Sequence, residues 1–330
     1  MSRLRKHLGY LAALQLLPAL ESGEETLVGG QAVMEGVMMR SPHAWGIAVR
    51  KPDGEVVTHS EGLERLSEKH KWMGWPFVRG VATLGQAMTL GYRALQFSAN
   101  VALEEEQKDV EPTKKKVEFS GWLAAVNIVL SLAFFIAVYK FIPWYATTYL
   151  AKHTAAVNNH WTMGLVDGVI RIALFLFFIW AVSRMKDIHR VFQFHGAEHK
   201  TVFAFESGKP VDIAAAQSFP TWHPRCGTSF LMTVMLISIP IYMFMPKMNF
   251  AQGFALRILM LPVIAGVSYE IIRFAARKRS SLFALMTKPG LWLQRITTQP
   301  CDDTQVDCAI KALDCAFEVE KQRGGQLVLA

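Results

Sequence analysis

The chain has 330 residues, of which 52% are hydrophobic, and its mean hydropathy is +0.22. Soluble proteins are rarely so apolar, so part of the chain is expected to lie in lipid. The formal net charge of +8 suits nucleic acid or an anionic membrane surface, and four cysteines in so long a chain exclude a disulfide framework.

The first segment, MSRLRKHLGYLAALQLLPAL, places basic residues before a short apolar run. The sequence ESGEE follows in place of a small-residue cleavage site, so no cleaved signal peptide is expected. The pattern predicts an amphipathic or interfacial helix over about residues 8–20. An uncleaved signal anchor is the less favoured alternative.

The next segment combines a hairpin pattern with a helical one. Apolar and polar residues alternate around Pro52, Asp53 and Gly54, which predicts a β-hairpin over about residues 45–60. The sequence PFVRGVATLGQAMTLGYRALQFSANVAL then predicts a helix over about residues 77–103. The charged stretch EEEQKDVEPTKKK reads as a linker to the apolar part of the chain.

Four stretches are apolar over a length close to the roughly 20 residues that a membrane-spanning helix needs. They cover about residues 121–142, 164–182, 229–245 and 253–272. A further helix is predicted near the C-terminus, where Pro300, Asp302 and Asp303 form a start signal.

The basic residues that flank these stretches give an orientation. They lie before the first span, after the second and after the fourth, at Lys114–Lys116, Arg184, Lys186, Arg190, Arg273, Arg277, Lys278 and Arg279. Because lysine and arginine concentrate on the cytosolic side, both termini and the segment 183–228 are predicted to be cytosolic. Membrane topology then accounts for the basic balance, and no nucleic-acid partner is needed.

Two histidines and a glutamate occur within five residues of the sequence FHGAEHKTVFAFESG. His195 and His199 are four apart and would share one face of a helix, with Glu198 beside them. The order H-x-x-E-H matches the inverzincin pattern, in which two imidazoles bind zinc and the glutamate is the general base. The plainer alternative is a hydrogen-bonded histidine pair on an interfacial helix.

A second group of candidate ligands occurs in the same cytosolic segment. The sequence TWHPRCGTSF holds His223, Arg225 and Cys226 just before the third span, and Glu270 lies in the last turn of the fourth. The predicted topology puts all of them on the side of His195 and His199. Cys226 could instead be a small buried residue, and Glu270 could simply pair with the nearby Arg273.

Several motifs together resemble the bacterial domain-of-unknown-function family 1385, also called the YqhQ-like family. They are GGQAVMEGVMMRSP, AVRKPDG, FHGAEHKTVFAFESG, HPRCGTSF and TTQPCDD, spread from about Val28 to the C-terminal helix. The resemblance implies an integral membrane protein of a family described as predicted metal-dependent enzymes, in which the three C-terminal cysteines are peripheral. The motif positions that it carries over are Gly29, Gly30, Gln31, Glu35, Gly36, Met39, Arg40, His195, Glu198, His199, His223, Cys226 and Gly227.

The first of these motifs has two interpretations. Glu35 and Arg40 are its charged residues, and the pair Gly29 and Gly30 allows a close backbone approach. The segment could cap the histidine and cysteine cluster, with Glu35 or Gln31 as a polar contributor. Equally, it could be a structural loop and the start of a strand.

The sequence thus predicts a mainly α-helical, polytopic inner-membrane protein with about four transmembrane helices. A small α/β cytosolic region would precede them (residues 1–117), the membrane domain would span 118–276, and a cytosolic helical tail would follow (277–330). The expected activity is metal-dependent hydrolysis of a lipid-linked or membrane substrate, with zinc or another divalent transition metal as cofactor. The alternatives are a non-enzymatic scaffold or regulator with a structural cluster, and a transporter or channel subunit. The expected partners are membrane lipids, and the chain could also form a homo-oligomer.

Overall fold

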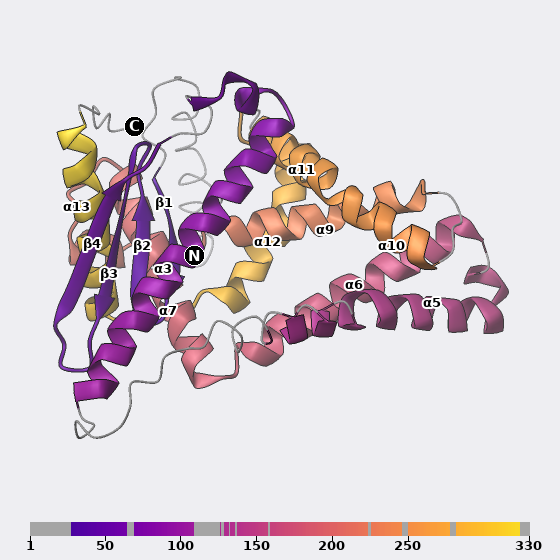
Figure 1. Cartoon of the computed structure of the whole chain (residues 1–330), viewed down its shortest axis with the longest axis horizontal. Helices are drawn as coiled ribbons and strands as arrows, with labels where there is room; N and C mark the ends of the chain where they lie inside the picture. The colour runs from indigo at the N-terminus through magenta and orange to yellow at the C-terminus, as the bar shows by residue number, and fades with distance from the viewer. Residues whose placement is uncertain are drawn as a thin grey trace, which may run out of the picture. The chain divides into compact units, whose positions relative to one another are not determined.

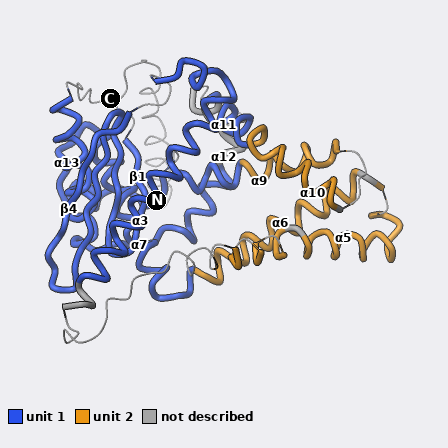
Figure 2. Tube along the Cα trace, viewed as in Figure 1, with its two compact units in different colours: residues 1–105, 183–233, 265–330 blue, residues 106–182, 234–264 orange. Residues whose placement is uncertain are grey.

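The computed structural model describes residues 28–323 except for 65–68, 109–125, 127–128, 132, 136, 158, 224–225, 246–249 and 278–281. The helix predicted over residues 8–20, the basic run at 114–116 and Arg225 lie outside the described residues. The chain divides into two compact units, which Figure 2 shows in different colours. Unit 1 comprises residues 1–105, 183–233 and 265–330, and unit 2 comprises residues 106–182 and 234–264.

Unit 1 is built on a four-stranded antiparallel sheet in the order β1-β2-β3-β4 (Figure 1). The strands are Gly29–Val33, Gly36–Arg40, Ala44–Arg50 and Val56–Gly62. The hairpin predicted around Gly54 is confirmed as β3 and β4. The motif at residues 29–40 forms a second hairpin, β1 and β2, closed by a turn in which Glu35 has a φ of 53°.

Helices cover both faces of this sheet, because residues along each strand alternate between two apolar clusters. Helix α3 (Val78–Lys108), which confirms the predicted helix, packs Leu90 and Ala94 against Met38 on one face. On the other face, α7 (Lys186–Glu206) and α13 (Asp303–Gln322) pack against Val37 and Met39. The short helices η2 (Lys71–Gly74) and α8 (Ile213–Gln217) and helix α12 (Leu282–Thr297) complete the unit.

The C-terminal helix begins where the sequence predicted. Asp302 caps α13 by accepting from Gln305 N at 2.9 Å, and the Gln305 side chain bonds back to Asp302 N, which makes a capping box. The helix is part of the main core of unit 1, with Val306, Ala309 and Leu313 buried in it among others. The core of unit 1 thus combines residues of the predicted N-terminal region, of the segment 183–228 and of the predicted C-terminal tail.

The buried carboxylate of Glu320 ties the end of α13 to the connection between β2 and β3. It accepts from Ser41 Oγ at 2.6 Å, from His43 N at 2.8 Å and from His43 Nδ1 at 2.8 Å. Burial alone would raise the pKa of Glu320, but these hydrogen bonds outweigh it and lower the pKa.

We expect Glu320→Gln to destabilise unit 1 at neutral pH by about 1–3 kcal/mol, because hydrogen bonds to a charged acceptor are lost. A depressed carboxyl pKa stabilises the fold above the unfolded-state pKa, and the contribution is lost as pH falls through the folded-state value. The difference from wild type should therefore shrink in acid, as measured by thermal unfolding at pH 7 and pH 4. The exposed Glu318→Gln on the same helix is the control. A pH-independent difference would contradict this role.

Unit 2 consists of apolar helices. It contains the short π-helix η3 (Ala137–Phe141), the short 3₁₀ helix η4 (Ala155–Val157), helices α5 (Ile142–His153), α6 (His160–Val182) and α10 (Phe250–Leu259), and parts of α9 (Gly227–Met243) and α11 (Leu261–Arg277). Three helical stretches are long and apolar enough to cross a membrane, namely Val129–His153, Trp161–Val182 and Ala251–Ile272. Helix α9 is apolar but has only 17 residues, so three of the four predicted spans meet this length.

The first predicted span needs a correction. The described helical residues extend to His153, whereas the first span was predicted to end at about residue 142. Pro143 is compatible with this because it occupies the first turn of α5, where no intrahelical donor is required. Hydropathy located this span but placed its end about ten residues early.

Candidate metal centre

Helix α7 carries His195, Glu198 and His199 within unit 1. Its apolar side chains, including Phe194 and Val202, are buried in the core that it shares with the sheet and α13. His195 and His199 lie one turn apart on the same side of the helix, with ring centroids 4.5 Å apart. Gly196 lets the chain after α12 come close, because a Cβ there would lie 2.3 Å from Gln299 O. The backbone of this segment can therefore contact the histidine rings.

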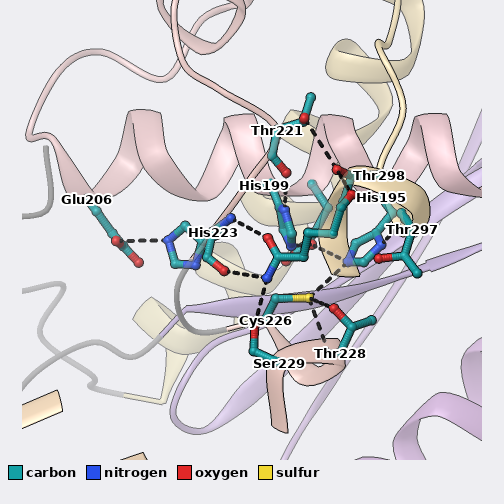
Figure 3. A network of polar contacts seen from close by, with 12 residues as sticks. His195, His199, Glu206, Thr221, His223, Cys226, Thr228, Ser229, Thr297 and Thr298 are labelled. Carbon is teal, nitrogen blue, oxygen red and sulfur yellow. Dashed lines mark hydrogen bonds and ion pairs between the residues drawn. The ribbon is translucent and has the colours of Figure 1, made fainter. Parts of the chain in front are cut away.

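Backbone carbonyls orient both rings (Figure 3). His195 Nδ1 donates to Thr297 O at 2.8 Å, and His199 Nδ1 donates to Thr221 O at 2.5 Å. Because a carbonyl can only accept, the proton of each neutral ring is on Nδ1, and Nε2 carries the lone pair that a metal would use. Histidines that bind metals are commonly held in this way by a backbone oxygen on the other ring nitrogen.

Cys226 completes a group of three converging ligand atoms. Its Sγ lies 3.2 Å from His195 Nε2, and a nitrogen of each histidine and the sulfur all lie within 4.8 Å of one another. Cys226 directly precedes α9, and the sulfur accepts from Thr228 N at 3.4 Å. A hydrogen bond from the first turn of a helix suits a thiolate, which is the form that binds metals.

The chemistry of His199 tests whether these residues fit a metal. His199 is 1% exposed, and its Nε2 makes no hydrogen bond with the described residues. Burial lowers the pKa of His199 to about 4, so the ring is neutral at physiological pH, as a metal ligand must be. A buried acceptor without a partner is costly, and a cation at this position would satisfy it. Two imidazoles and a thiolate are ligands that zinc accepts.

Glu198 lies beside the three ligands. Its Oε2 is 3.5 Å from His199 Nε2 and 3.9 Å from His195 Nε2, and the residue is 5% exposed. Burial raises the pKa of Glu198, while the electrostatic influence of His195 and His223 and of the Gly30 backbone acts in the opposite direction. Gly30 fits here because it has no side chain, since a Cβ would lie 2.6 Å from Glu198 Cγ.

His223 lies next to the ligand group, with its ring centroid 5.7 Å from that of His199. Burial lowers its pKa to about 4, so the neutral ring donates from Nε2 to Glu206 Oε2 at 3.2 Å. The buried Gln294 holds the same residue by its backbone, accepting from His223 N at 2.7 Å and donating to His223 O at 2.8 Å. These contacts hold both the backbone and the ring of His223 (Figure 3).

The other predicted site residues lie elsewhere. Glu270 pairs through both oxygens with Arg79 and accepts from Phe77 N at 3.2 Å, which ties α11 to the start of α3. Glu35 pairs with Arg190, and Gln31 packs against Gly91 of α3. Arg40 donates to Gln86 at 3.3 Å. The first motif thus ties the β1–β2 hairpin to α3 and α7, and its described contact with the centre is made by Gly30.

Comparison with known proteins gives a family but no activity. A family model described as "Protein of unknown function (DUF1385)" matches residues 75–319. The uncharacterized protein YqhQ of Bacillus subtilis (strain 168) is 30% identical over 303 residues, which are 88% of this chain and 92% of that protein. No solved structure matches the chain.

Proposed function

Because the chain belongs to the DUF1385 family of proteins of unknown function, we propose its function from the geometry of the centre: a metal-dependent hydrolase. The observation that carries the proposal is that ligand atoms of His195, His199 and Cys226 converge beside Glu198. One of these atoms, His199 Nε2, is buried and makes no hydrogen bond with the described residues. The three side chains would hold a divalent metal, with zinc favoured by the mixed nitrogen and sulfur ligands.

Three protein ligands leave a coordination position open, which distinguishes catalytic zinc sites from structural ones. The bound metal would supply Lewis-acid polarisation. Glu198 would act as the general base, receiving a proton at Oε2, and its burial favours a pKa closer to neutrality than that of an exposed glutamate. The carbonyls of Thr221 and Thr297 keep both imidazoles in the orientation that ligation requires.

The apolar helices support a location in the membrane. The three long ones would span the inner membrane, and the positive-inside rule would then put both termini and α7 on the cytosolic side. Cys226 precedes the apolar helix α9 without an intervening residue, which favours a substrate held at the membrane, such as a lipid-linked molecule or a membrane peptide.

A structural role is the second candidate, and Glu198 is the reason for it. A carboxylate oxygen 3.5 Å from His199 Nε2 could serve as the fourth ligand of a closed site. Such a site would stabilise a membrane scaffold or regulator without chemistry. The two candidates therefore differ in the number of protein ligands.

Metal analysis and X-ray absorption of the purified full-length protein test the proposal. We expect about one zinc per chain, with one sulfur at about 2.3 Å, two histidine nitrogens at about 2.0–2.1 Å and a non-protein light atom. Cys226→Ser should remove the sulfur shell, whereas Cys315→Ser, which alters a cysteine of α13, should leave it unchanged. Absence of metal from wild type after zinc loading would refute the proposal. A carboxylate as fourth ligand would favour the structural role.

A further inference from the structure

The outer edge of β1 is a site for another strand. β1 is the first strand of the order β1-β2-β3-β4, so it pairs with a described strand on one side only. In its pairing with β2, Val33 lies opposite Gly36 at one end and Gly29 lies opposite Arg40 at the other. With only two residues between Val33 and Gly36, that pair exchanges both ladder hydrogen bonds. The alternation of an antiparallel ladder then directs the backbone N–H and C=O groups of Gly30 and Ala32 away from β2.

Helix α7 contacts β1, and Ala32 packs partly against the core, so the accessible part of this edge among the described residues is at Gly30. Gly30 is exposed and Ala32 is half-buried. Neither Gly29 nor Gly30 has a side chain, and a Cβ at Gly29 would meet nothing within 4 Å. A second backbone can therefore approach closely enough to pair. Unpaired strand edges bind extended peptides through main-chain hydrogen bonds.

The same edge lies close to the candidate metal centre. Gly30 lies against Glu198, because a Cβ at Gly30 would lie 2.6 Å from Glu198 Cγ, and the Glu198 carboxylate in turn lies beside the Nε2 atoms of His195 and His199. A chain paired with Ala32 and running past Gly30 would bring its own carbonyl groups beside Glu198. We infer that the substrate is a polypeptide segment in extended conformation, which adds to β1 as a fifth strand. The inference rests on the proposed hydrolytic function.

At the strand edge itself, charge favours a neutral backbone over a phosphate-bearing lipid headgroup. The charged side chain beside Gly30 and the imidazoles of His195 and His199 is the Glu198 carboxylate. Phosphate groups are usually bound by arginine or lysine, so a phosphate would be drawn to a bound zinc ion and not to the groups of β1. A peptide backbone is neutral and presents the donors and acceptors that an open edge requires.

The test uses the full-length, zinc-loaded protein in nanodiscs with a pool of synthetic 12-residue peptides. Ala32→Pro removes the outward N–H without touching a ladder bond to β2, and Ser60→Pro, at an outward position of the opposite edge strand β4, is the control. We expect cleavage of the pool to fall about 10-fold or more in the Ala32 variant and to be unchanged in the Ser60 variant. Equal zinc content in all three proteins would show that the centre is intact.

Two further readouts separate the inference from the proposed function. Peptide addition should slow amide hydrogen exchange of Ala32, whose N–H points away from β2, with or without cleavage. Exchange already slow without peptide, or equal cleavage by both variants, would overturn the strand inference. Hydrolysis of phosphatidylglycerol vesicles without peptide cleavage would overturn it too and leave a hydrolase. Failure to bind zinc would instead refute the proposed function.

Discussion

His199→Ala is expected to lower the affinity for zinc by more than about 100-fold. Loss of a residue that merely orients a ligand costs about 10–100-fold in metal affinity, and removal of a ligand should cost more. Competition against a chromophoric chelator measures the effect on the full-length protein. The control is His189→Ala, which alters an exposed histidine of the same helix. Unchanged affinity in His199→Ala would exclude His199 as a ligand.

The same substitution should change stability in a metal-dependent way. Zinc at about 1,000 times its dissociation constant stabilises the folded state by about 4 kcal/mol, and His199→Ala should lose this increment. Without metal, the variant loses packing, but it also loses a buried acceptor that costs about 1–3 kcal/mol when unbonded. The difference in thermal midpoint from wild type should therefore be large with zinc and small after chelation. An equal difference in both states would indicate a purely structural histidine.

Local patterns predicted the elements that carry the site. The spacing of His195 and His199 requires only that the segment be helical, and a helix brings both rings to one side. The capping residues of α13 likewise act within one turn, so its start at Asp303 could be predicted. The convergence with Cys226 was suggested by topology and motif. It depends on contacts between residues 31 positions apart.

The parts that sequence analysis missed depend on distant or backbone groups. Glu270 was weighed against Arg273, three residues away, but its described partner Arg79 is 191 residues away. Thr221 and Thr297 orient the imidazoles through carbonyls, which every residue type possesses, so no pattern could mark them. The β1–β2 hairpin was obscured because glycine, alanine and methionine alternate less clearly than branched and charged residues do.

Glu198→Gln is expected to lower kcat for hydrolysis by about 10²–10⁴-fold with little change in zinc content. The amide keeps the size of the side chain and can still accept from Gly30, but it cannot serve as a proton acceptor. The cleavage assay measures the loss, and metal analysis confirms that the ligands are intact. Asp187→Asn, an exposed change on the same helix, should have no effect on either.

The outcome of Glu198→Gln also decides between the two candidate functions. If the carboxylate is the fourth ligand of a structural site, the amide should weaken zinc binding, and hydrolysis would be absent in wild type as well. If it is the general base, zinc stays bound, KM is nearly unchanged and kcat carries the loss, because the group acts only on the proton that moves. Zinc retention with full activity would contradict both roles. Glu198 would then be a buried carboxylate that the fold tolerates, held by Gly30 and the two imidazoles.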